Sequence, residues 1–310
     1  MRVVFLGTPD FAVPSLERLC LGGYDVVGVV TQPDRPQGRG YRLAPCAVKC
    51  CAQKNKLSVY SFNRIRKSSA VQILRDMEPD VMVTAAYGQI LSQEVLDVPR
   101  LGCINIHASL LPKYRGPAPI QWAVIHGETR TGVTTMMTDI GVDTGDILLQ
   151  RDTQIGPDET AGELFARLAV LGADLLLETL EQLKHGQIKR MPQKHDEATH
   201  FPMLKKEDGR IDWTKSANDI HNLVRGVNPW PGAYCFYDDT PIKIWKTKAC
   251  DEIPGLPPGG VVCCSDKKGL FISCGEGTLQ ILELQLAGKK RMDACSALGG
   301  FAITEGSILK

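Results

Sequence analysis

The chain has 310 residues, of which 43% are hydrophobic and 23% are charged, and its formal net charge is +1. This profile is typical of a globular protein with a sizeable core, and it excludes disorder over most of the length. No apolar run approaches the roughly 20 residues of a membrane-spanning helix, and the opening run Val3–Leu6 is too short for a secretory signal. We therefore expect a cytoplasmic protein that does not enter a membrane.

The first half of the chain alternates apolar, β-branched runs with segments of helical periodicity. This alternation is typical of a parallel sheet wound by right-handed crossovers, so the predicted fold class is α/β. Strands are expected over residues 2–7, 24–31, 57–60, 80–85, 102–107, 132–137 and 146–151. Helices are expected up to residue 22 and over residues 44–56, 69–77, 119–126 and 160–183, and residues 32–40 are expected to form only a loop.

The pattern changes after residue 188. Residues 189–206 are polar, basic and without periodicity, which is typical of a linker. Beyond them, a helix (216–227) precedes short strands near residues 232–237, 241–248, 260–264, 269–274 and 279–285. Short strands separated by turn signals favour a small antiparallel barrel. We therefore predict a mostly parallel sheet domain at 1–188, a linker at 189–206 and a small β-barrel domain at 207–310.

Eleven cysteines are spread along the chain, an odd number with no C-x-x-C pair. The spacing of the cysteines and histidines does not match a zinc site or a thioredoxin-like redox motif. We therefore expect free thiols in a reducing compartment and no bound metal.

Basic residues are concentrated in one window. Residues 31–67 hold nine lysines and arginines against the single acid Asp34, an excess of eight positive charges. Arg35, Arg39 and Arg42 stand among glycines and prolines, where a flexible arm can reach a phosphate backbone. The window is either a contact for a polyanion or a solvated face, and charge alone does not decide between them.

Ligands of an open parallel sheet bind beyond the carboxyl ends of its strands. The loop at residues 7–12 lacks the G-x-G-x-x-G spacing of a dinucleotide site, which disfavours a nicotinamide enzyme. The loop after residue 107 is richer. Asn105 and His107 are two residues apart in a strand, so they project to the same face at its end. An amide donor beside an imidazole suits stabilisation of an oxyanion and proton transfer.

A third loop at this edge carries three carboxylates, Asp139, Asp143 and Asp146. A carboxylate near His107 would orient the imidazole and could itself relay protons. Asp139 could instead cap the loop, and Asp146 could serve the turn. The residues alone do not choose among the three.

At these residues the chain resembles the methionyl-tRNA formyltransferases, nearly end to end. The segments that carry the resemblance are FLGTPDFA (5–12), TQPDRPQGRG (31–40), AAYGQIL (85–91), NIHASLLPKYRGPAPIQWA (105–123), GVDTGDIL (141–148), NPWPGA (228–233) and AGKKRM (287–292). The N-x-H, SLLP and DTG elements are shared with formyltransferases that act on a ribonucleotide or a sugar nucleotide, so they indicate the reaction better than the acceptor. The resemblance implies a Rossmann-like domain followed by an OB-like barrel.

The resemblance also implies roles for particular residues. It places the catalytic residues at Asn105, His107 and Asp143, and it alone selects Asp143 among the three acids. It implies 10-formyltetrahydrofolate as co-substrate, with no metal. Folate contacts are implied at Ser109, Leu110, Leu111 and Pro112, and at Tyr87, Gly88 and Gln89 in the wall of the pterin pocket.

The implied function is transfer of the formyl group to the α-amino group of initiator methionyl-tRNA in translation initiation. Asn105 and His107 would stabilise the oxyanion while Asp143 supports His107 and relays a proton. The family's tRNA-binding arm matches the basic loop, with its key arginine at Arg39 and with Arg35 and Arg42 beside it.

Two alternatives remain open. A nucleotide-sugar or ribonucleotide acceptor would need neither a basic arm nor a barrel. A non-catalytic RNA-binding OB protein would be expected to lack one of the three catalytic residues, and all three are present. Nothing in the sequence demands a dimer, so we expect a monomer.

Overall fold

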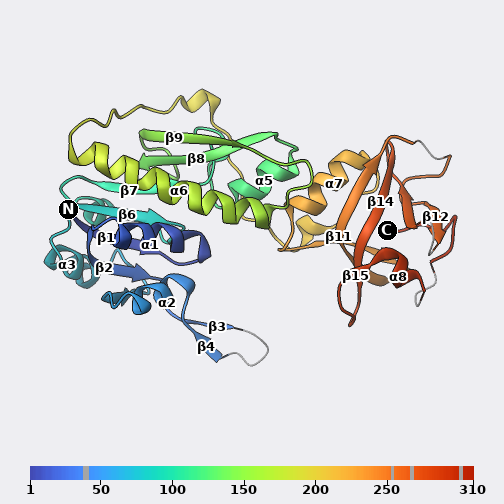
Figure 1. Cartoon of the computed structure of the whole chain (residues 1–310), viewed down its shortest axis with the longest axis horizontal. Helices are drawn as coiled ribbons and strands as arrows, with labels where there is room; N and C mark the ends of the chain where they lie inside the picture. The colour runs from blue at the N-terminus through green and yellow to red at the C-terminus, as the bar shows by residue number, and fades with distance from the viewer. Residues whose placement is uncertain (38–41, 253–254, 266–268, 300–302) are drawn as a thin grey trace. The chain divides into compact units, whose positions relative to one another are not determined.

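The computed structural model describes residues 1–37, 42–252, 255–265, 269–299 and 303–310 (Figure 1). The chain divides into two compact units. The first comprises Met1–Pro119, Arg130–Gln154 and Phe165–Phe201, and the second comprises Ile120–Thr129, Ile155–Leu164 and Pro202–Lys310. The predicted boundaries, with domains at 1–188 and 207–310 and a linker at 189–206, stay a proposal. They concern which parts of the chain can fold independently.

A seven-stranded sheet forms the centre of the first unit. In sheet order its strands are β5 (Val59–Ser61), β2 (Asp25–Thr31), β1 (Arg2–Gly7), β6 (Val81–Ala85), β7 (Cys103–His107), β8 (Arg130–Met137) and β9 (Ile147–Gln154). The strands from β5 to β7 run parallel, whereas β8 pairs antiparallel with both β7 and β9. The chain order reverses between β1 and β6, as in Rossmann-like sheets. The predicted mostly parallel, Rossmann-like sheet is confirmed.

Helices cover both faces of this sheet because its central strands are apolar on both sides. On one face, α6 (Ala161–Lys184) lies so close to β7 that a Cβ on Gly172 would meet Ile106 at 2.9 Å. The helix α1 (Val13–Leu21) joins α6 through the ion pair of Arg18 with Asp174, and α2 (Ala47–Lys54) packs beside α1. On the other face, α3 (Ser68–Asp76) and α4 (Gln93–Leu96) share a core with alternate residues of β1.

The prediction that residues 32–40 form only a loop is wrong in part. Arg35–Gln37 (β3) and Arg42–Ala44 (β4) pair as a two-stranded antiparallel ribbon. Each strand has three residues and lies among prolines and glycines, so periodicity gives no signal for it. We call residues 32–44 the arm. Arg39 lies outside the described residues.

The segment after α6 returns along the first unit as a strap, residues 191–201, which contains a short 3-10 helix at His195–Glu197. Met191 and Ile147 exchange two backbone hydrogen bonds of 2.9 Å. Further along, the N–H of Arg115 donates to the carbonyl of Thr199 at 2.9 Å. The backbone of His200 forms an isolated parallel β-bridge with that of Arg115. The strap lies within the stretch predicted as a linker, and its isolated backbone bonds leave no periodic pattern in the sequence.

The second unit is built on an antiparallel sheet of short strands. Its order is β10 (Ala233–Tyr237), β11 (Thr240–Cys250), β14 (Thr278–Leu286), β13 (Gly269–Ser273) and β12 (Val261–Ser265), with β15 (Met292–Asp293) paired to β14. The helices of this unit include α5 (Pro119–Ile125), α7 (Ala217–Gly226) and α8 (Ala294–Leu298). Trp213, Ile244 and Ile272 are part of a separate apolar core. Strand β15 and helix α8 were not predicted because both are too short to show periodicity.

Residues 307–310 connect the two edge strands of this sheet. Lys310 exchanges backbone hydrogen bonds of 2.7 and 2.8 Å with Phe236 on β10. The carbonyl of Ser307 accepts from Val261 on β12 at 2.8 Å, and Leu309 donates to the carbonyl of Gly259 at 2.9 Å. Bonding to both edges is the arrangement expected of a small antiparallel barrel.

Candidate active site

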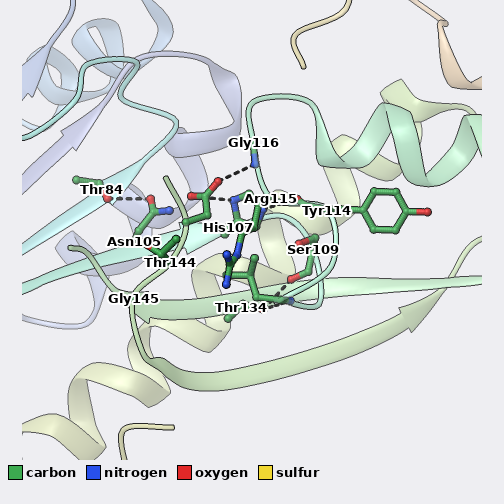
Figure 2. Close-up of polar contacts among 12 residues, drawn as sticks. Thr84, Asn105, His107, Ser109, Tyr114, Arg115, Gly116, Thr134, Thr144 and Gly145 are labelled. Atoms are coloured by element: carbon green, nitrogen blue, oxygen red, sulfur yellow. Dashed lines mark hydrogen bonds and ion pairs between the residues drawn. The ribbon is translucent and has the colours of Figure 1, made fainter. Parts of the chain in front are cut away.

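The residues predicted to carry chemistry lie at the carboxyl edge of the first unit's sheet. Strands β6 and β7 end there at Ala85 and His107, and the connection between β8 and β9, residues 138–146, turns beside them. Figure 2 shows Thr84 next to Asn105, and the loop that bears Tyr114 and Gly116 beyond His107. This is the edge at which an open parallel sheet binds its ligands.

Asn105 is held by the neighbouring strand. Its Oδ1 accepts a hydrogen bond of 2.8 Å from the hydroxyl of Thr84, a buried residue directly opposite it in the β6–β7 register. Because the carbonyl oxygen is used by Thr84, the amide nitrogen is directed toward the side of the site where His107 lies (Figure 2). Asn105 is therefore oriented as a hydrogen-bond donor.

His107 is 6% exposed, and its hydrogen bonds define its tautomer. The ring Nε2 lies 2.9 Å from the backbone carbonyl of Tyr114. A carbonyl can only accept a hydrogen bond, so Nε2 carries a proton and donates it. Nδ1 is the ring atom left for chemistry, and it faces Oδ1 of Asp143 at 3.5 Å.

The carboxyl group of Asp143 is held between two loops. Its Oδ2 accepts a hydrogen bond of 2.8 Å from the backbone N–H of Gly116, and the side chain is 15% exposed. Gly116 has φ +105°, and a Cβ at this position would collide with the carbonyl of Phe201. Only glycine can therefore present its N–H to the carboxylate at this point.

The other two acids of the loop have different partners. Oδ1 of Asp139 accepts from the N–H of Gly141 at 3.0 Å and from the hydroxyl of Thr144 at 2.6 Å, so Asp139 caps the turn. Asp146 contributes its backbone carbonyl, which accepts from the N–H of Met137 at 2.8 Å. The structure thus places Asp143 against His107, a choice that the residues alone left open.

The predicted folate-contacting loop, Ser109–Pro112, is fixed by β8. The buried hydroxyl of Thr134 donates to the carbonyl of Ser109 at 2.7 Å and accepts from the N–H of Leu111 at 3.2 Å. The Ser109 hydroxyl donates to a carbonyl four residues later, at 2.7 Å, so it serves the loop itself. Ser109 and Leu111 are buried, whereas Leu110 and Pro112 are partly exposed.

The loop after β6 holds the other predicted folate contacts. The Tyr87 side chain is part of the core beneath α3 and α4, and burial raises the pKa of its hydroxyl to about 12. The Gln89 amide donates to the carbonyl of Phe62 at 2.7 Å, which tethers a neighbouring loop. Gly88 is exposed with φ +85°, and Ile90 is 74% exposed. A ligand at this loop would therefore meet its backbone and Ile90 rather than the side chains of Tyr87 and Gln89.

The arm begins beside this loop. Gln32 donates to the carbonyl of Tyr87 at 3.2 Å, and Asp34 accepts two contacts of 2.8 and 2.9 Å from Nζ of Lys49 on α2. Arg35 is exposed, and Arg42 opens strand β4. The base of the arm is thus joined both to the site loop and to α2.

Sequence reasoning missed four residues that support the site. Thr84 and Thr134 lie in strands, where threonine is read as a strand former rather than as a hydrogen-bonding group. Arg115 had a weak signal, because it is a cation within a loop rich in proline and glycine. Gln193 had none, since it lies in a stretch without periodicity or motif, yet it is 6% exposed and bonded to the Asp143 loop.

A family model described as formyl transferase matches residues 1–180, and one described as formyl transferase, C-terminal domain, matches residues 203–302. A methionyl-tRNA formyltransferase of Acetivibrio thermocellus is 49% identical over 309 residues, covering 100% of this chain and 99% of that protein. The methionyl-tRNA formyltransferase of Solibacter usitatus is 51% identical over 309 residues, with coverages of 100% and 98%. The chain belongs to the methionyl-tRNA formyltransferase family.

Solved structures extend the likeness beyond this family. An N-formyltransferase from Helicobacter canadensis, solved in complex with folinic acid and dTDP-3-aminofucose, has a TM-score of 0.67 and 20% identity. The match covers 93% of this chain and 99% of that one. At this identity the likeness shows the formyltransferase fold and leaves the acceptor open.

Three further findings concern metals, cysteines and membranes. Among the described residues, no group of three or more His, Cys, Asp or Glu is arranged to hold a metal ion. The eleven cysteines are free thiols. In the part of the chain that the structure describes, no helix is long and apolar enough to cross a membrane.

Proposed function

We propose that the protein transfers the formyl group of 10-formyltetrahydrofolate to the α-amino group of initiator methionyl-tRNA. The observation that carries this proposal is the meeting of an amide donor, an imidazole and a carboxylate, from Asn105, His107 and Asp143, at one edge of the sheet. Relatives that are 49% and 51% identical over the whole chain are methionyl-tRNA formyltransferases, which supports methionyl-tRNA as the acceptor.

Formyl transfer forms a bond from the α-amino nitrogen to the formyl carbon and breaks the bond from that carbon to N10 of the folate. One proton leaves the amine, one is taken up by N10, and negative charge develops on the formyl oxygen. When bound, 10-formyltetrahydrofolate supplies the activated formyl group. The protein's tasks are to position both substrates, stabilise the charge and move the protons.

Asn105 is the donor that we assign to the developing charge. Its amide nitrogen is directed into the site because Thr84 holds the carbonyl oxygen. A donor that is already oriented needs no reorganisation when the charge appears, and this makes it effective in a site that excludes water. We expect removal of this donor to lower turnover by roughly 10²–10³.

His107 and Asp143 handle the protons. The bond to Tyr114 fixes the imidazole ring and leaves Nδ1 facing the Asp143 carboxylate. Asp143 in its ionised form accepts the proton of the attacking amine. Because Nε2 already donates to Tyr114, protonation of Nδ1 makes an imidazolium, which can stabilise the charge on the formyl oxygen or pass its proton toward N10.

The loops beside this centre fit a folate. A pterin ring is flat and needs an apolar slot with backbone groups at its edge. The exposed backbone at Gly88, the exposed Ile90 and the partly exposed Leu110 offer such surfaces. We assign the folate contacts to the loops 87–89 and 109–112, through Tyr87, Gly88, Gln89, Ser109, Leu110, Leu111 and Pro112, mainly by their backbone.

The arm is the part that we assign to the tRNA. The sequence of the arm supplies three positive charges, at Arg35, Arg39 and Arg42, and phosphate contacts of this kind position a nucleic acid without reading its sequence. We further propose that the protein acts as a monomer in the cytoplasm and does not bind membranes. The eleven free thiols accord with a reducing compartment.

The decisive experiment measures formyl transfer from 10-formyltetrahydrofolate to three acceptors: methionyl-tRNA, a dTDP-amino sugar and glycinamide ribonucleotide. We expect transfer to methionyl-tRNA with a kcat/KM that falls steeply as salt rises, because the tRNA is a polyanion. A preference for either small acceptor, or activity on methionyl-tRNA that is indifferent to salt, would overturn the proposal. Binding of tRNA without any transfer would favour the non-catalytic alternative.

A further inference from the structure

The side-chain amide of Gln193, in the strap, forms hydrogen bonds through all of its donors and its acceptor, next to the loop that carries Asp143. Its Nε2 donates to two backbone carbonyls, that of Asp143 at 2.9 Å and that of Gly145 at 2.7 Å. Its Oε1 accepts from Nε of Arg115 at 3.1 Å and from Nη2 of Arg115 at 2.6 Å. Both N–H groups and the carbonyl oxygen of this amide therefore have partners inside the protein.

Arg115 links this amide to the rest of the site. It is 2% exposed, and its Nη2 also lies 3.3 Å from Nδ1 of His195 on the strap. The residues before and after Arg115 in the chain, Tyr114 and Gly116, each use a backbone group to hold a catalytic side chain. The carbonyl of Tyr114 binds His107, and the N–H of Gly116 binds Asp143 (Figure 2). One buried contact thus joins the loop that fixes His107 to the loop that carries Asp143.

The backbone at Asp143 needs such support. Its φ is +54°, in the left-handed region that residues other than glycine rarely adopt. A non-glycine residue persists there only where its surroundings determine the conformation. Gln193 binds the carbonyls on both sides of this turn, at residues 143 and 145, and so holds the conformation that points the carboxylate at His107.

We propose that Gln193, supported by Arg115, is a positioning residue that sets the Asp143 carboxylate against His107. The inference rests on the proposed function, since it assumes that Asp143 moves protons in formyl transfer. Gln193 acts through the loop and does not touch substrate. A strap without a catalytic group of its own thereby contributes to the rate of reaction.

The test uses a variant that keeps the shape and removes the donors. In Gln193→Glu, the carboxylate retains its partner Arg115 but presents oxygen to the carbonyls of Asp143 and Gly145, which cannot donate. We expect kcat to fall on the order of 10- to 100-fold, because small misplacements of a catalytic group have effects of this size. Both KM values should stay near those of the native protein, whereas the thermal midpoint should fall by a few degrees because two carbonyls lose their donor. Gln187→Glu, an exposed glutamine just after α6, is the matched control and should be silent.

A double-mutant cycle separates positioning from general stability. If Gln193 acts through Asp143, then Gln193→Glu should cause no further loss of kcat in an Asp143→Asn background. Full additivity, or a loss of kcat that merely tracks a lowered thermal midpoint, would overturn the proposal. Should Gln193→Glu fail to fold, Gln193→Met removes the donors at similar volume and without a buried charge.

The two proposals fail in different ways. Native protein that does not formylate methionyl-tRNA contradicts the proposed function before any variant is made. If Asp143→Asn has a strongly reduced kcat while both Gln193 variants turn over at the native rate, the function stands and the positioning role is wrong.

Discussion

The loops around His107 and the arm at residues 32–44 belong to the same unit, yet they are held in different ways. Around His107, hydrogen bonds of 2.6–2.9 Å involve the buried residues Thr84, Arg115 and Gln193. The arm has two strands of three residues and a partly buried ion pair between Asp34 and Lys49 at its base. Chemistry at a carbonyl needs donors at fixed positions, whereas contacts to a phosphate backbone need only positive charge within reach.

The largest effect that would sharpen this contrast is expected from His107→Ala. Loss of the imidazole removes a proton-transfer group, which typically contributes about 10²–10⁴ in rate. We expect kcat to fall by this factor while KM for methionyl-tRNA stays unchanged, because the arm is intact. Steady-state kinetics at fixed salt measure both constants, with the exposed His185→Ala as control. A rise in KM without a fall in kcat would contradict this expectation, because His107 would then act in tRNA binding rather than in catalysis.

The converse change neutralises the arm. Replacing Arg35, Arg39 and Arg42 by alanine should raise KM for methionyl-tRNA by about tenfold or more and leave kcat nearly unchanged. The slope of log KM against log salt should also flatten by about one for each phosphate that the arm no longer neutralises. Arg75→Ala, at an exposed position on α3, serves as a control that removes one positive charge outside the arm. An unaltered salt slope would mean that the arm does not meet the tRNA.

A smaller effect is expected from the residue that orients Asn105. Thr84→Val removes the hydroxyl that holds the amide and keeps the branched shape. A hydrogen bond of this kind contributes about 1 kcal/mol, so kcat should fall roughly fivefold with KM unaffected. Thr84→Ser should restore most of the rate, because it retains the donor. Equal rates for the valine and serine variants would mean that Asn105 is oriented by other contacts.

The smallest effect on activity is expected at the start of β6, away from both regions. The N–H of Arg2, and then Arg100, hold the pKa of Asp80 below its ordinary value. A lowered pKa means that this carboxylate stabilises the fold above about pH 4 and that the stabilisation is lost as pH falls further. Asp80→Asn should therefore lower the free energy of unfolding by about 1 kcal/mol at pH 7.

Urea unfolding of Asp80→Asn and native protein, followed from pH 7 toward pH 3, checks this expectation. The two stabilities should converge on acidification while kcat at pH 7 stays native. A constant gap between them across the pH range would contradict the assignment.

Much of the first unit could be predicted because its signals are periodic. Apolar runs indicated the strands of the sheet, and the two-residue spacing placed Asn105 and His107 on one face of β7. The choice of Asp143 needed the family resemblance, since three similar acids share one loop and their partners depend on backbone conformation. Strands β3 and β4 stayed hidden because each has three residues.

The supporting residues could not be predicted for a different reason. Gln193 and Arg115 are 78 positions apart, and their contact depends on how the strap returns along the sheet. A buried glutamine in a polar, aperiodic stretch looks like a surface residue, because composition does not reveal burial. Single-sequence patterns describe local geometry, whereas these contacts are tertiary.

The pairing of residues 307–310 with β10 and β12 affects when the second unit can fold during synthesis of the chain. During synthesis the first unit can complete its sheet by residue 154, but the second cannot close until Lys310 has emerged. Until then the edges at Phe236 and Val261 present unpaired backbone groups, which are sites for pairing with other chains. Deleting residues 307–310 would make that transient state permanent, so such a truncation should aggregate even though it removes no predicted catalytic group.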